Sequence, residues 1–372
     1  MRIGVPTEIK EHEYRVGLVP ASVKELTHDG HKVLVQTGAG LGAGLTDQDY
    51  IDAGAEVVAD ADQVFSGAEL IVKVKEPQAA ERRKLRPGQI LFTYLHLAPD
   101  PEQTRDLIAS GATCIAYETV TAADGSLPLL TPMSEVAGRM AVQVGASCLE
   151  KAHGGRGVLL GGVPGVAQGD VVILGGGVAG SSAALVAIGM GANVTVVDRS
   201  LPVLRHIAER FGTSVNTVFS TRDAVDRLVT NSDLVIGTVL VPGAKAPKLI
   251  TAAMVRRMRP GAVIVDVAID QGGCSETSHA TTHTHPTYVV DNVVHYCVAN
   301  MPGAVARTST LALNNATLPF VLALAHKGWR QAMIDDPHLR AGLNVHAGNL
   351  THEAVASALG MPVVSVNAIL GV

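Results

Sequence analysis

The feature that most constrains the fold is a repeated alternation of short apolar runs with segments of helical spacing. Ten runs have the length of a β-strand, and they cover residues 2–5, 32–36, 70–74, 89–93, 113–117, 171–174, 193–197, 215–219, 233–237 and 262–267. Strands that alternate with helices form parallel sheets through right-handed crossovers. The pattern therefore predicts an α/β protein.

The alternation occurs twice, once before about residue 125 and once after residue 170. It predicts two Rossmann-like, doubly wound parallel-sheet domains with a cleft between them. A helix predicted over residues 134–152 separates them, with Pro132 before its start and Ser134 as its N-cap. Further helices are predicted near 304–326 and 351–359, and this C-terminal segment is expected to pack back on the first domain.

The composition limits which binding partners and which cellular compartment are expected. The 372 residues carry 29 Lys and Arg against 34 Asp and Glu, a net charge of −5, so nothing favours nucleic acid or an anionic membrane. The four cysteines form no C-x-x-C pair, which indicates a reducing, cytoplasmic compartment. The first residues lack the pattern of a signal peptide.

One stretch, residues 171–197, has no charged residue and invites comparison with a membrane span. It contains six glycines, starts like a strand and ends in Val-Thr-Val-Val before Asp198. A buried strand–helix–strand unit explains these features better than a spanning helix.

The same stretch carries a glycine pattern typical of dinucleotide binding. Gly175, Gly177 and Gly180 form G-x-G-x-x-G directly after an apolar strand, and a helix is predicted to begin near Val178 or Ala179. Free N–H groups at such a helix start bind a pyrophosphate, and small residues let the backbone approach it. A glycine-rich turn used only for packing is the alternative.

An acid at the end of the next strand adds to the pattern. Asp198 stands 23 residues after Gly175, where a carboxylate accepts both ribose hydroxyls of NAD and repels the 2′-phosphate of NADP. The following Arg199 could hold a 2′-phosphate, stack on adenine or be solvated. The pattern predicts NAD as the cofactor.

Polar residues just past apolar runs are candidates for a binding site, because ligands of open α/β sheets bind at the carboxyl ends of strands. Lys73 and Lys75 are predicted on one strand face with Lys75 at its exit, His96 follows the next strand, and Asp270 lies between a buried strand and a glycine turn. Each has a structural alternative: a solvated strand end, a capping histidine and a turn residue. Arg15 could be a salt-bridge partner only.

Several longer stretches together resemble the alanine dehydrogenase/pyridine nucleotide transhydrogenase family. They are GVPTE at 4–8 with Arg15-Val16, VKVKEP at 72–77, LHL at 95–97, MSEVAG at 133–138, GGVPGV at 161–166, VPGAKAP at 241–247, DVAIDQGG at 266–273 and VANMP at 298–302. Their order and spacing extend over the chain to about residue 330. Blocks of this length are far more specific than the glycine pattern.

The resemblance implies a substrate domain that starts with residues 1–128, an NAD-binding domain over 129–303, and a return of residues 304–372 to the substrate domain. It implies a cytoplasmic homohexamer that converts L-alanine and NAD reversibly into pyruvate, ammonium and NADH. Within such an enzyme, Arg15 and Lys75 would bind the substrate, and His96 and Asp270 would be the acid–base pair.

The resemblance also implies a set of cofactor contacts. Besides the glycines they are Ser134, Val178, Ala179, Asp198, Ser220, Val239, Leu240, Val267, Asp270, Val298, Asn300 and Met301. The chain departs from relatives that carry Lys at the position of Val203 or Arg at that of His279, and from those with Glu and His in place of Ala323 and Lys327.

Two questions stay open at this level. His279, His283 and His285 have a spacing that superficially suits a metal, but a solvated loop is the prediction, and no metal is expected. The rival functions are the nucleotide-binding module of a proton-translocating transhydrogenase and an opine or saccharopine-type dehydrogenase. The joint presence of Lys75, His96 and Asp270 favours the alanine enzyme.

Overall fold

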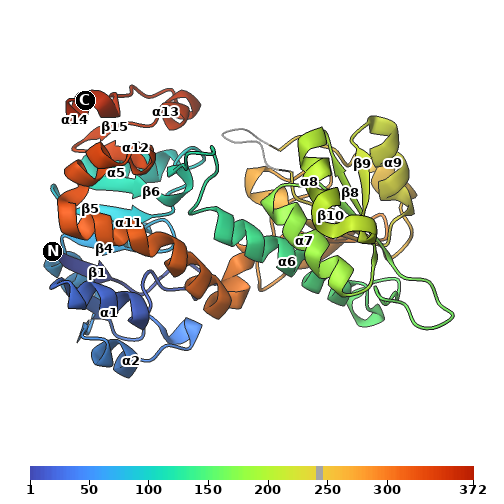
Figure 1. Ribbon diagram of the computed structural model, residues 1–372, viewed down its shortest axis with the longest axis horizontal. Coiled ribbons are helices and arrows are strands. Elements are labelled where there is room, and N and C mark those ends of the chain that lie inside the picture. The colour runs from blue at the N-terminus through green and yellow to red at the C-terminus, as the bar shows by residue number, and fades with distance from the viewer. Residues whose placement is uncertain (240–245) are drawn as a thin grey trace. The chain divides into compact units, whose positions relative to one another are not determined.

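The chain forms two compact units in the computed structural model, which describes residues 1–239 and 246–372. Unit 1 combines Met1–Met133 with Gly303–Val372, and unit 2 is Ser134–Pro302. Figure 1 shows the blue to cyan N-terminal segment and the orange to red C-terminal segment together in unit 1. Unit 2 is therefore inserted within the sequence of unit 1.

Unit 1 is built on one mixed sheet. Its strand order is β15-β14-β6-β5-β4-β1-β2-β3. The strands are β1 (Arg2–Val5), β2 (Lys32–Gln36), β3 (Glu56–Val58), β4 (Leu70–Val72), β5 (Ile90–Thr93), β6 (Thr113–Ala116), β14 (Leu343–His346) and β15 (Asn349–Leu350). The strands from β3 to β6 are parallel and follow the 3-2-1-4-5-6 order of a Rossmann sheet, with β14 added antiparallel to β6.

Helices pack around this sheet. They are α1 (Pro20–His28), η1 (Leu41–Ala43), α2 (Asp47–Asp52), α3 (Ala61–Gly67), α4 (Ala79–Arg82), α5 (Pro101–Ser110), η2 (Tyr117–Thr119), α11 (Ala306–Asp335), α12 (Pro337–Arg340), α13 (Glu353–Leu359) and α14 (Val366–Leu370). The core contains Leu91 and Cys114 from the N-terminal part and Val345, Leu350 and Val355 from the C-terminal part. Burial of apolar side chains from both segments stabilises the assembled unit.

The longest helix, α11, forms hydrogen bonds to the segment that follows β1. Asn314 on α11 accepts hydrogen bonds from the Val19 N–H and the Ser22 hydroxyl and donates to the Gly17 carbonyl. By length and composition Met301–Asp335 could cross a membrane, but core helices pass the same test, and 44 % of its apolar window is buried within the protein. Its contacts are those of a core helix.

Unit 2 is built on a second sheet, in the order β12-β13-β11-β10-β7-β8-β9. The strands are β7 (Asp170–Leu174), β8 (Asn193–Asp198), β9 (Asn216–Phe219), β10 (Leu234–Gly237), β11 (Val263–Asp266), β12 (Thr287–Val290) and β13 (Val293–Tyr296). The six strands from β9 to β13 are parallel, and β12 pairs antiparallel with β13. The order repeats that of unit 1, with the reversal between β7 and β10.

The helical elements of unit 2 flank these strands. They are η3 (Lys151–His153), α7 (Val178–Gly189), α8 (Leu201–Phe211), η4 (Gly212–Ser214), α9 (Arg222–Asn231), α10 (Ala252–Arg257) and η5 (Val267–Gln271), while α6 (Thr131–Cys148) and η6 (Met301–Val305) cross the boundaries between the units. The uncharged stretch 171–197 forms most of β7, all of α7 and most of β8. The prediction of a strand–helix–strand unit there is confirmed.

The α/β class and all ten predicted strands are confirmed, with three corrections. The strand predicted over 70–74 ends at Val72, and each sheet has an antiparallel edge. The helix predicted from Ser134 begins at Thr131, so Ser134 is not its N-cap. Pro132 fits within the first turn because no intrahelical bond is required of its nitrogen there.

A buried histidine on β13 makes stability depend on pH. The His295 ring is fully buried, with Nδ1 3.0 Å from the Val293 carbonyl oxygen and Nε2 2.8 Å from the Thr277 hydroxyl. Burial lowers the pKa of His295, and the Val293 hydrogen bond and the charge of Asp266 offset this only in part. The neutral ring therefore belongs to the folded state.

We expect the free energy of unfolding to fall once the pH drops below about 6.5, because the unfolded chain then binds a proton that folded His295 does not bind. The contribution is complete above the unfolded pKa of about 6.5 and is lost as the pH falls through the lowered folded pKa. Urea unfolding across this range should show a shallower slope for His295→Gln than for wild type or the exposed-site control His285→Gln. Equal slopes would contradict the assignment.

Candidate active site

Three predicted site residues of unit 1 follow strands that end at one edge of its sheet. Arg15 lies in the loop after β1, Lys75 lies after β4 and His96 after β5. The reversal of strand order between β1 and β4 opens such an edge to ligands. The Thr93 hydroxyl donates to the Lys75 carbonyl oxygen at 2.9 Å, so the β4 and β5 exits lie side by side.

Arg15 is buried and held by Glu13. Its Nε lies 2.6 Å from Glu13 Oε1 and its Nη2 lies 2.5 Å from Glu13 Oε2, while Nη1 lies 3.0 Å from the Met133 sulfur. Burial alone would lower the pKa of Arg15, but the hydrogen bonds and charge of Glu13 raise it. The result is a fixed, fully charged guanidinium, which suits recognition of a carboxylate.

Lys73 and Lys75 do not share a strand face as predicted, because β4 ends at Val72. Lys73 is fully buried, and its Nζ lies 2.9 Å from Glu8 Oε2 and 2.7 Å from Glu81 Oε1. Lys75 is half-buried, and its backbone N–H donates to Glu8 Oε1 at 3.3 Å. Lys73 is thus a structural cation, whereas Lys75 stands at the strand exit.

Glu76 contributes negative charge near both Lys75 and His96. Its Oε1 pairs with Lys10, and its Oε2 is buried without a hydrogen-bond partner among the described residues. Burial raises the pKa of Glu76, but Lys75, the Lys10 hydrogen bond and His96 together bring the pKa below its usual value. A carboxylate is therefore maintained beside both predicted site residues.

His96 has a strained backbone and an exposed side chain. Its φ is 49°, in the left-handed region that residues with a β-carbon seldom adopt, at a cost of about 1–3 kcal/mol. The ring stacks on Tyr94 with centroids 5.8 Å apart and 16° between the planes. Within the described residues neither ring nitrogen forms a hydrogen bond, so both are open to a ligand.

The glycine turn of unit 2 has the shape that a pyrophosphate needs. Gly175 has φ 100°, and α7 starts at Val178 without a side-chain cap from Gly177. A β-carbon on Gly180 would lie 1.8 Å from the Gly175 carbonyl oxygen. The backbone is thus drawn close around an uncapped helix start, where free N–H groups attract an anion.

Asp198 ends β8 beside this turn. Its Oδ2 accepts the Gly176 N–H at 2.7 Å, and its Oδ1 accepts the Ser200 N–H at 2.8 Å. The Ser220 N–H donates to the Asp198 carbonyl oxygen at 2.9 Å, so the ends of β8 and β9 meet here. The structure therefore brings the glycine turn, Asp198 and Ser220 together.

Asp270 lies exposed on the short helix η5, directly after β11. The buried Asp266 holds the segment after η5: its Oδ2 accepts the Cys274 N–H at 2.8 Å and the Ser278 hydroxyl at 2.6 Å. A turn at Gly272, with φ 89°, ends η5. Asp270 is thus presented to solvent from an anchored turn.

The remaining predicted cofactor contacts lie in several segments of unit 2. Val298 and Met301 are buried, and Val178 is an exposed apolar residue. The half-buried members of the set are Ser134, Ala179, Val239, Val267 and Asn300. Asn300 has φ 70°, and His283 Nε2 lies 3.0 Å from its carbonyl oxygen. Leu240 lies outside the described residues, as do 241–245 of the VPGAKAP stretch.

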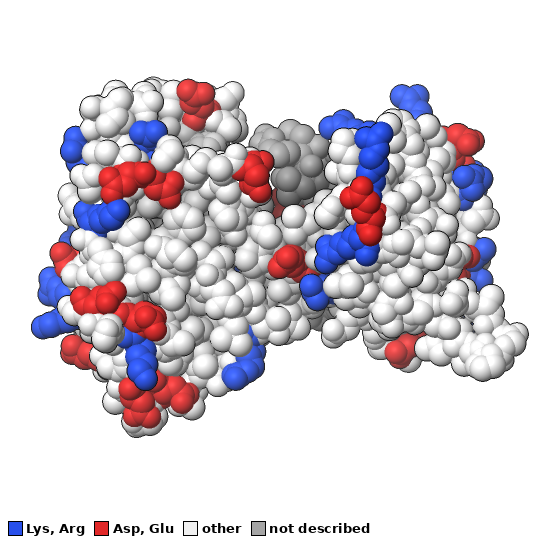
Figure 2. Space-filling view, viewed as in Figure 1, with Lys and Arg blue, Asp and Glu red and all other residues white. Residues whose placement is uncertain are grey.

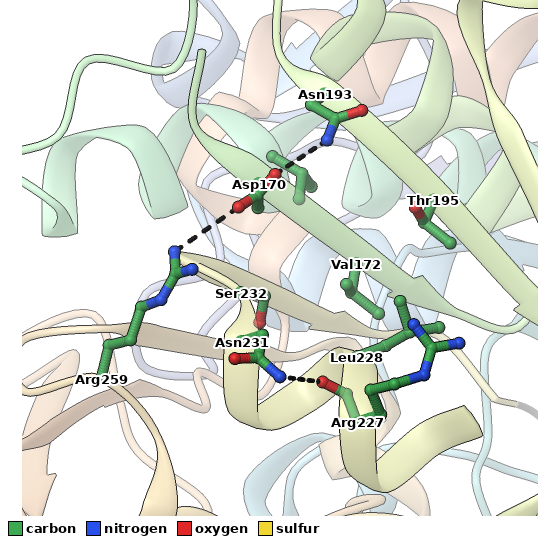
Figure 3. A pocket seen from close by; sticks show the side chains of 10 residues that line it. Asp170, Val172, Asn193, Thr195, Arg227, Leu228, Asn231, Ser232 and Arg259 are labelled. Carbon is green, nitrogen blue, oxygen red and sulfur yellow. Dashed lines mark hydrogen bonds and ion pairs between the residues drawn. The ribbon is translucent and has the colours of Figure 1, made fainter. Parts of the chain in front are cut away.

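Two hollows within the described residues lie apart from most of these groups. One, of about 330 Å³, is at the amino ends of β7 and β8, opposite the glycine turn (Figure 3). There Asp170 lies between Asn193 and Arg259, at 2.8 Å and 3.5 Å. The other, of about 320 Å³, is lined by Arg15 and Glu13 but not by Lys75 or His96.

The histidine loop has other contacts in place of a metal site. The His279 ring stacks on Tyr288 with centroids 3.7 Å apart, and His283 contacts the Asn300 carbonyl. Over residues 1–239 and 246–372 no group of three or more His, Cys, Asp or Glu could hold a metal ion. Lys327 pairs with Asp335 at 2.6 Å.

Known proteins match the chain throughout its length. The model for the alanine dehydrogenase/PNT N-terminal domain matches residues 4–137, and that for the C-terminal domain matches residues 141–353. The chain belongs to the alanine dehydrogenase/PNT family. An alanine dehydrogenase of Halomonas elongata is 62% identical over 100% of both chains, and one of Mycobacterium tuberculosis is 56% identical over 97% of this chain and 98% of its own.

Solved structures of family members agree with this membership. An L-alanine dehydrogenase has a TM-score of 0.94 and 54% identity, covering 97% of this chain and 99% of its own. A transhydrogenase from Sinorhizobium meliloti has a TM-score of 0.82 and 26% identity, covering 95% of this chain and 100% of its own. By both TM-score and sequence identity, the present chain is more similar to this alanine dehydrogenase than to this transhydrogenase.

The carboxylates that hold the predicted site residues were not among the residues predicted from the sequence. The Glu13 carboxylate accepts hydrogen bonds from the Arg15 guanidinium. Glu8 accepts the Lys75 N–H, and Glu118 accepts the His96 N–H. Glu8 lies within the family-like stretch at 4–8, and Glu13 lies two residues before Arg15. Their positions could therefore have indicated a role at the site. Glu118 stands 22 positions from His96 with no local pattern to connect them.

Proposed function

We propose that the chain catalyses the reversible, NAD-dependent oxidative deamination of L-alanine to pyruvate, ammonium and NADH. The observation that carries the proposal is 62% identity over 100% of both chains to a curated alanine dehydrogenase. The carboxyl edge of the unit 1 sheet supports it, because a carboxylate-binding cation, a lysine and a histidine follow three strands there.

In this proposal unit 1 is the substrate domain and unit 2 the NAD-binding domain. Arg15, already oriented by Glu13, binds the carboxylate of alanine or pyruvate, and Lys75 binds the carbonyl or imine end. The glycine turn, the start of α7 and Asp198 hold NAD, which when bound supplies the hydride acceptor. Fixed cations reduce the orientational freedom that the substrate must lose before reaction.

His96 and Asp270 carry the proton chemistry. His96 accepts the proton that the substrate ammonium must lose before the Cα–H bond can break, and it later passes protons between water and the amine. The Asp270 carboxylate stabilises the cationic iminium of the substrate and helps to place the attacking water. The two open ring nitrogens of His96 suit this exchange.

The test is NADH formation with purified protein and L-alanine, glycine, L-serine or a lysine-derived amino acid. We expect L-alanine to give the highest kcat/KM, and pyruvate with ammonium to consume NADH. A preference for the lysine-derived substrate would favour the opine or saccharopine-type alternative. Activity with none of the four would favour the transhydrogenase alternative.

Cofactor choice should follow Asp198. We expect kcat/KM to be higher with NAD than with NADP by at least about two orders of magnitude, because the carboxylate would face a 2′-phosphate without a donor to offer it. Steady-state kinetics with both cofactors check this. Comparable kcat/KM values would contradict the prediction, and an Arg199→Ala variant would then show whether that side chain accepts the phosphate.

Metal removal should leave the activity unchanged. Arg15 and Lys75 already supply the positive charge that fixes the substrate, and Ala323 and Lys327 offer no metal donor at neutral pH. We expect chelator-treated protein, with its metal content measured, to oxidise L-alanine at the untreated rate. A loss of activity restored by a stoichiometric divalent metal would refute this.

The proposed assembly is a homohexamer in the cytoplasm. An uncharged loop, residues 157–169, projects from unit 2 and exposes the apolar Leu159, Val163 and Val166. Figure 2 shows the projecting end of unit 2 without charged side chains. An exposed apolar projection of this kind supports association with another subunit.

A further inference from the structure

The strained backbone of His96 is held by one carboxylate. Glu118 lies in η2, directly after β6, and is half-buried. Its Oε1 accepts the His96 N–H at 2.6 Å and the Leu95 N–H at 3.1 Å, and its Oε2 lies 3.2 Å from the same Leu95 nitrogen. Two consecutive backbone N–H groups therefore converge on one carboxyl group.

This convergence explains how His96 remains in the left-handed region. At φ 49° the β-carbon is crowded, so an exposed residue would relax to an ordinary conformation unless neighbours prevented it. Charge-assisted hydrogen bonds to Glu118 favour the arrangement in which both N–H groups point the same way. Glu118 thus opposes the relaxation.

The ring of His96 is oriented from the other side by Tyr94. Tyr94 is buried, and its hydroxyl donates to the Leu129 carbonyl oxygen, so the stacked ring rests on a fixed surface. Within the part of the chain that the structure describes, Glu118 forms hydrogen bonds to the backbone of Leu95 and His96 and none to the imidazole. We therefore expect the main effect of Glu118 on turnover to pass through the position of His96.

The same arrangement, in which one carboxylate accepts two consecutive backbone N–H groups, occurs where the neighbouring strand β4 ends. Glu8 Oε1 accepts the Val74 N–H at 2.6 Å and the Lys75 N–H at 3.3 Å. Two residues predicted to act on the substrate are thus each set by a carboxylate from another segment of unit 1. The recurrence at Lys75 and His96 indicates positioning rather than a chance surface contact.

We infer that Glu118 is a positioning residue for the proposed reaction: it holds the His96 backbone in the left-handed conformation from which the imidazole reaches the substrate. The inference rests on the proposed function. On this inference Glu118 increases kcat but contributes little to the binding of alanine or NADH. Catalysis depends on such placement because small displacements of a proton-transfer group reduce the rate steeply.

The test uses Glu118→Gln, whose amide keeps the shape but can offer only one acceptor oxygen. We expect kcat for L-alanine oxidation to fall about tenfold, and about a hundredfold for Glu118→Ala, with KM for L-alanine and Kd for NADH within about twofold of wild type. The matched control is Glu69→Gln, because Glu69 accepts the Arg2 N–H at 2.7 Å at the opposite edge of the same sheet. It should keep wild-type kcat.

A double-mutant cycle separates positioning from general support of the fold. In a His96→Ala background Glu118→Gln should cause no further loss of kcat/KM, because the residue that it positions is gone. Multiplicative losses, or a Glu118→Gln enzyme within twofold of wild type, would overturn the inference. Glu118→Asp serves if the glutamine variant does not fold. A wild-type protein that does not oxidise L-alanine would instead refute the proposed function.

Discussion

Replacement of His96 by alanine is expected to lower kcat for L-alanine oxidation by about two to four orders of magnitude, the usual effect of removing a general acid–base group. Substrate ammonium must lose a proton before hydride can leave, and solvent performs this transfer poorly without a positioned base. Neither ring nitrogen of His96 has a hydrogen-bond partner among residues 1–239 and 246–372, and Glu118 holds its strained backbone. The measurement is kcat at saturating L-alanine and NAD.

NADH binding is the control for this variant, because the predicted cofactor contacts lie in unit 2 and His96 lies in unit 1. We expect the Kd for NADH to be unchanged in His96→Ala. Asp270→Asn should also lower kcat, since it keeps the shape but removes the charge that stabilises the iminium. Near-normal turnover of His96→Ala would show that the histidine has a structural role.

Replacement of Lys73 by methionine is expected to lower the free energy of unfolding by about 3–5 kcal/mol, the cost of removing one partner from a buried ion pair. The ammonium is fully buried between Glu8 and Glu81. Burial alone would lower the pKa of Lys73, but the two carboxylates raise it; burial is also the main cause that raises the pKa of Glu8. Without Lys73, two desolvated carboxylates would face each other.

Urea unfolding of the full chain measures this loss. The matched control is Lys327→Met, because the Lys327–Asp335 pair at 2.6 Å is partly exposed and such pairs contribute about 0–1 kcal/mol. Since Glu8 accepts hydrogen bonds from the N–H groups of Val74 and Lys75, Lys73→Met should also raise KM for pyruvate. A variant as stable as the Lys327→Met control would show that the carboxylates find other partners.

The central strands could be predicted because both faces of a parallel strand are buried. Such strands appear in sequence as apolar runs, as in the first three residues of Ile90–Thr93 and of Val263–Asp266. The strands that were not predicted lie at or near sheet edges: β3 is three residues with an exposed Glu56, and β15 is two residues long. Edge strands are short and carry polar side chains, so their pattern is weak.

The residues of the candidate site could be predicted from the sequence, but the residues that hold them in place could not. Lys75 and His96 stand just after apolar runs, and the rule that parallel strands end at one edge places them together. The partners that hold them come from elsewhere in the chain: Glu8 is 67 positions from Lys75, and Glu118 is 22 from His96. No local pattern encodes such pairings, because they depend on which strand exits become neighbours in the folded sheet.

The insertion of unit 2 within unit 1 sets an order of events during synthesis on the ribosome. Strand β6 ends at Ala116, but its neighbour β14 begins at Leu343, and β14 and β15 also supply Val345 and Leu350 to the core. At roughly 5–20 residues per second the intervening chain takes about 10–45 seconds to make. For that time the nascent N-terminal segment carries an unpaired apolar strand edge. Unit 2, which is continuous in sequence, can fold first, and chaperone dependence should be greatest for chains stalled before residue 343.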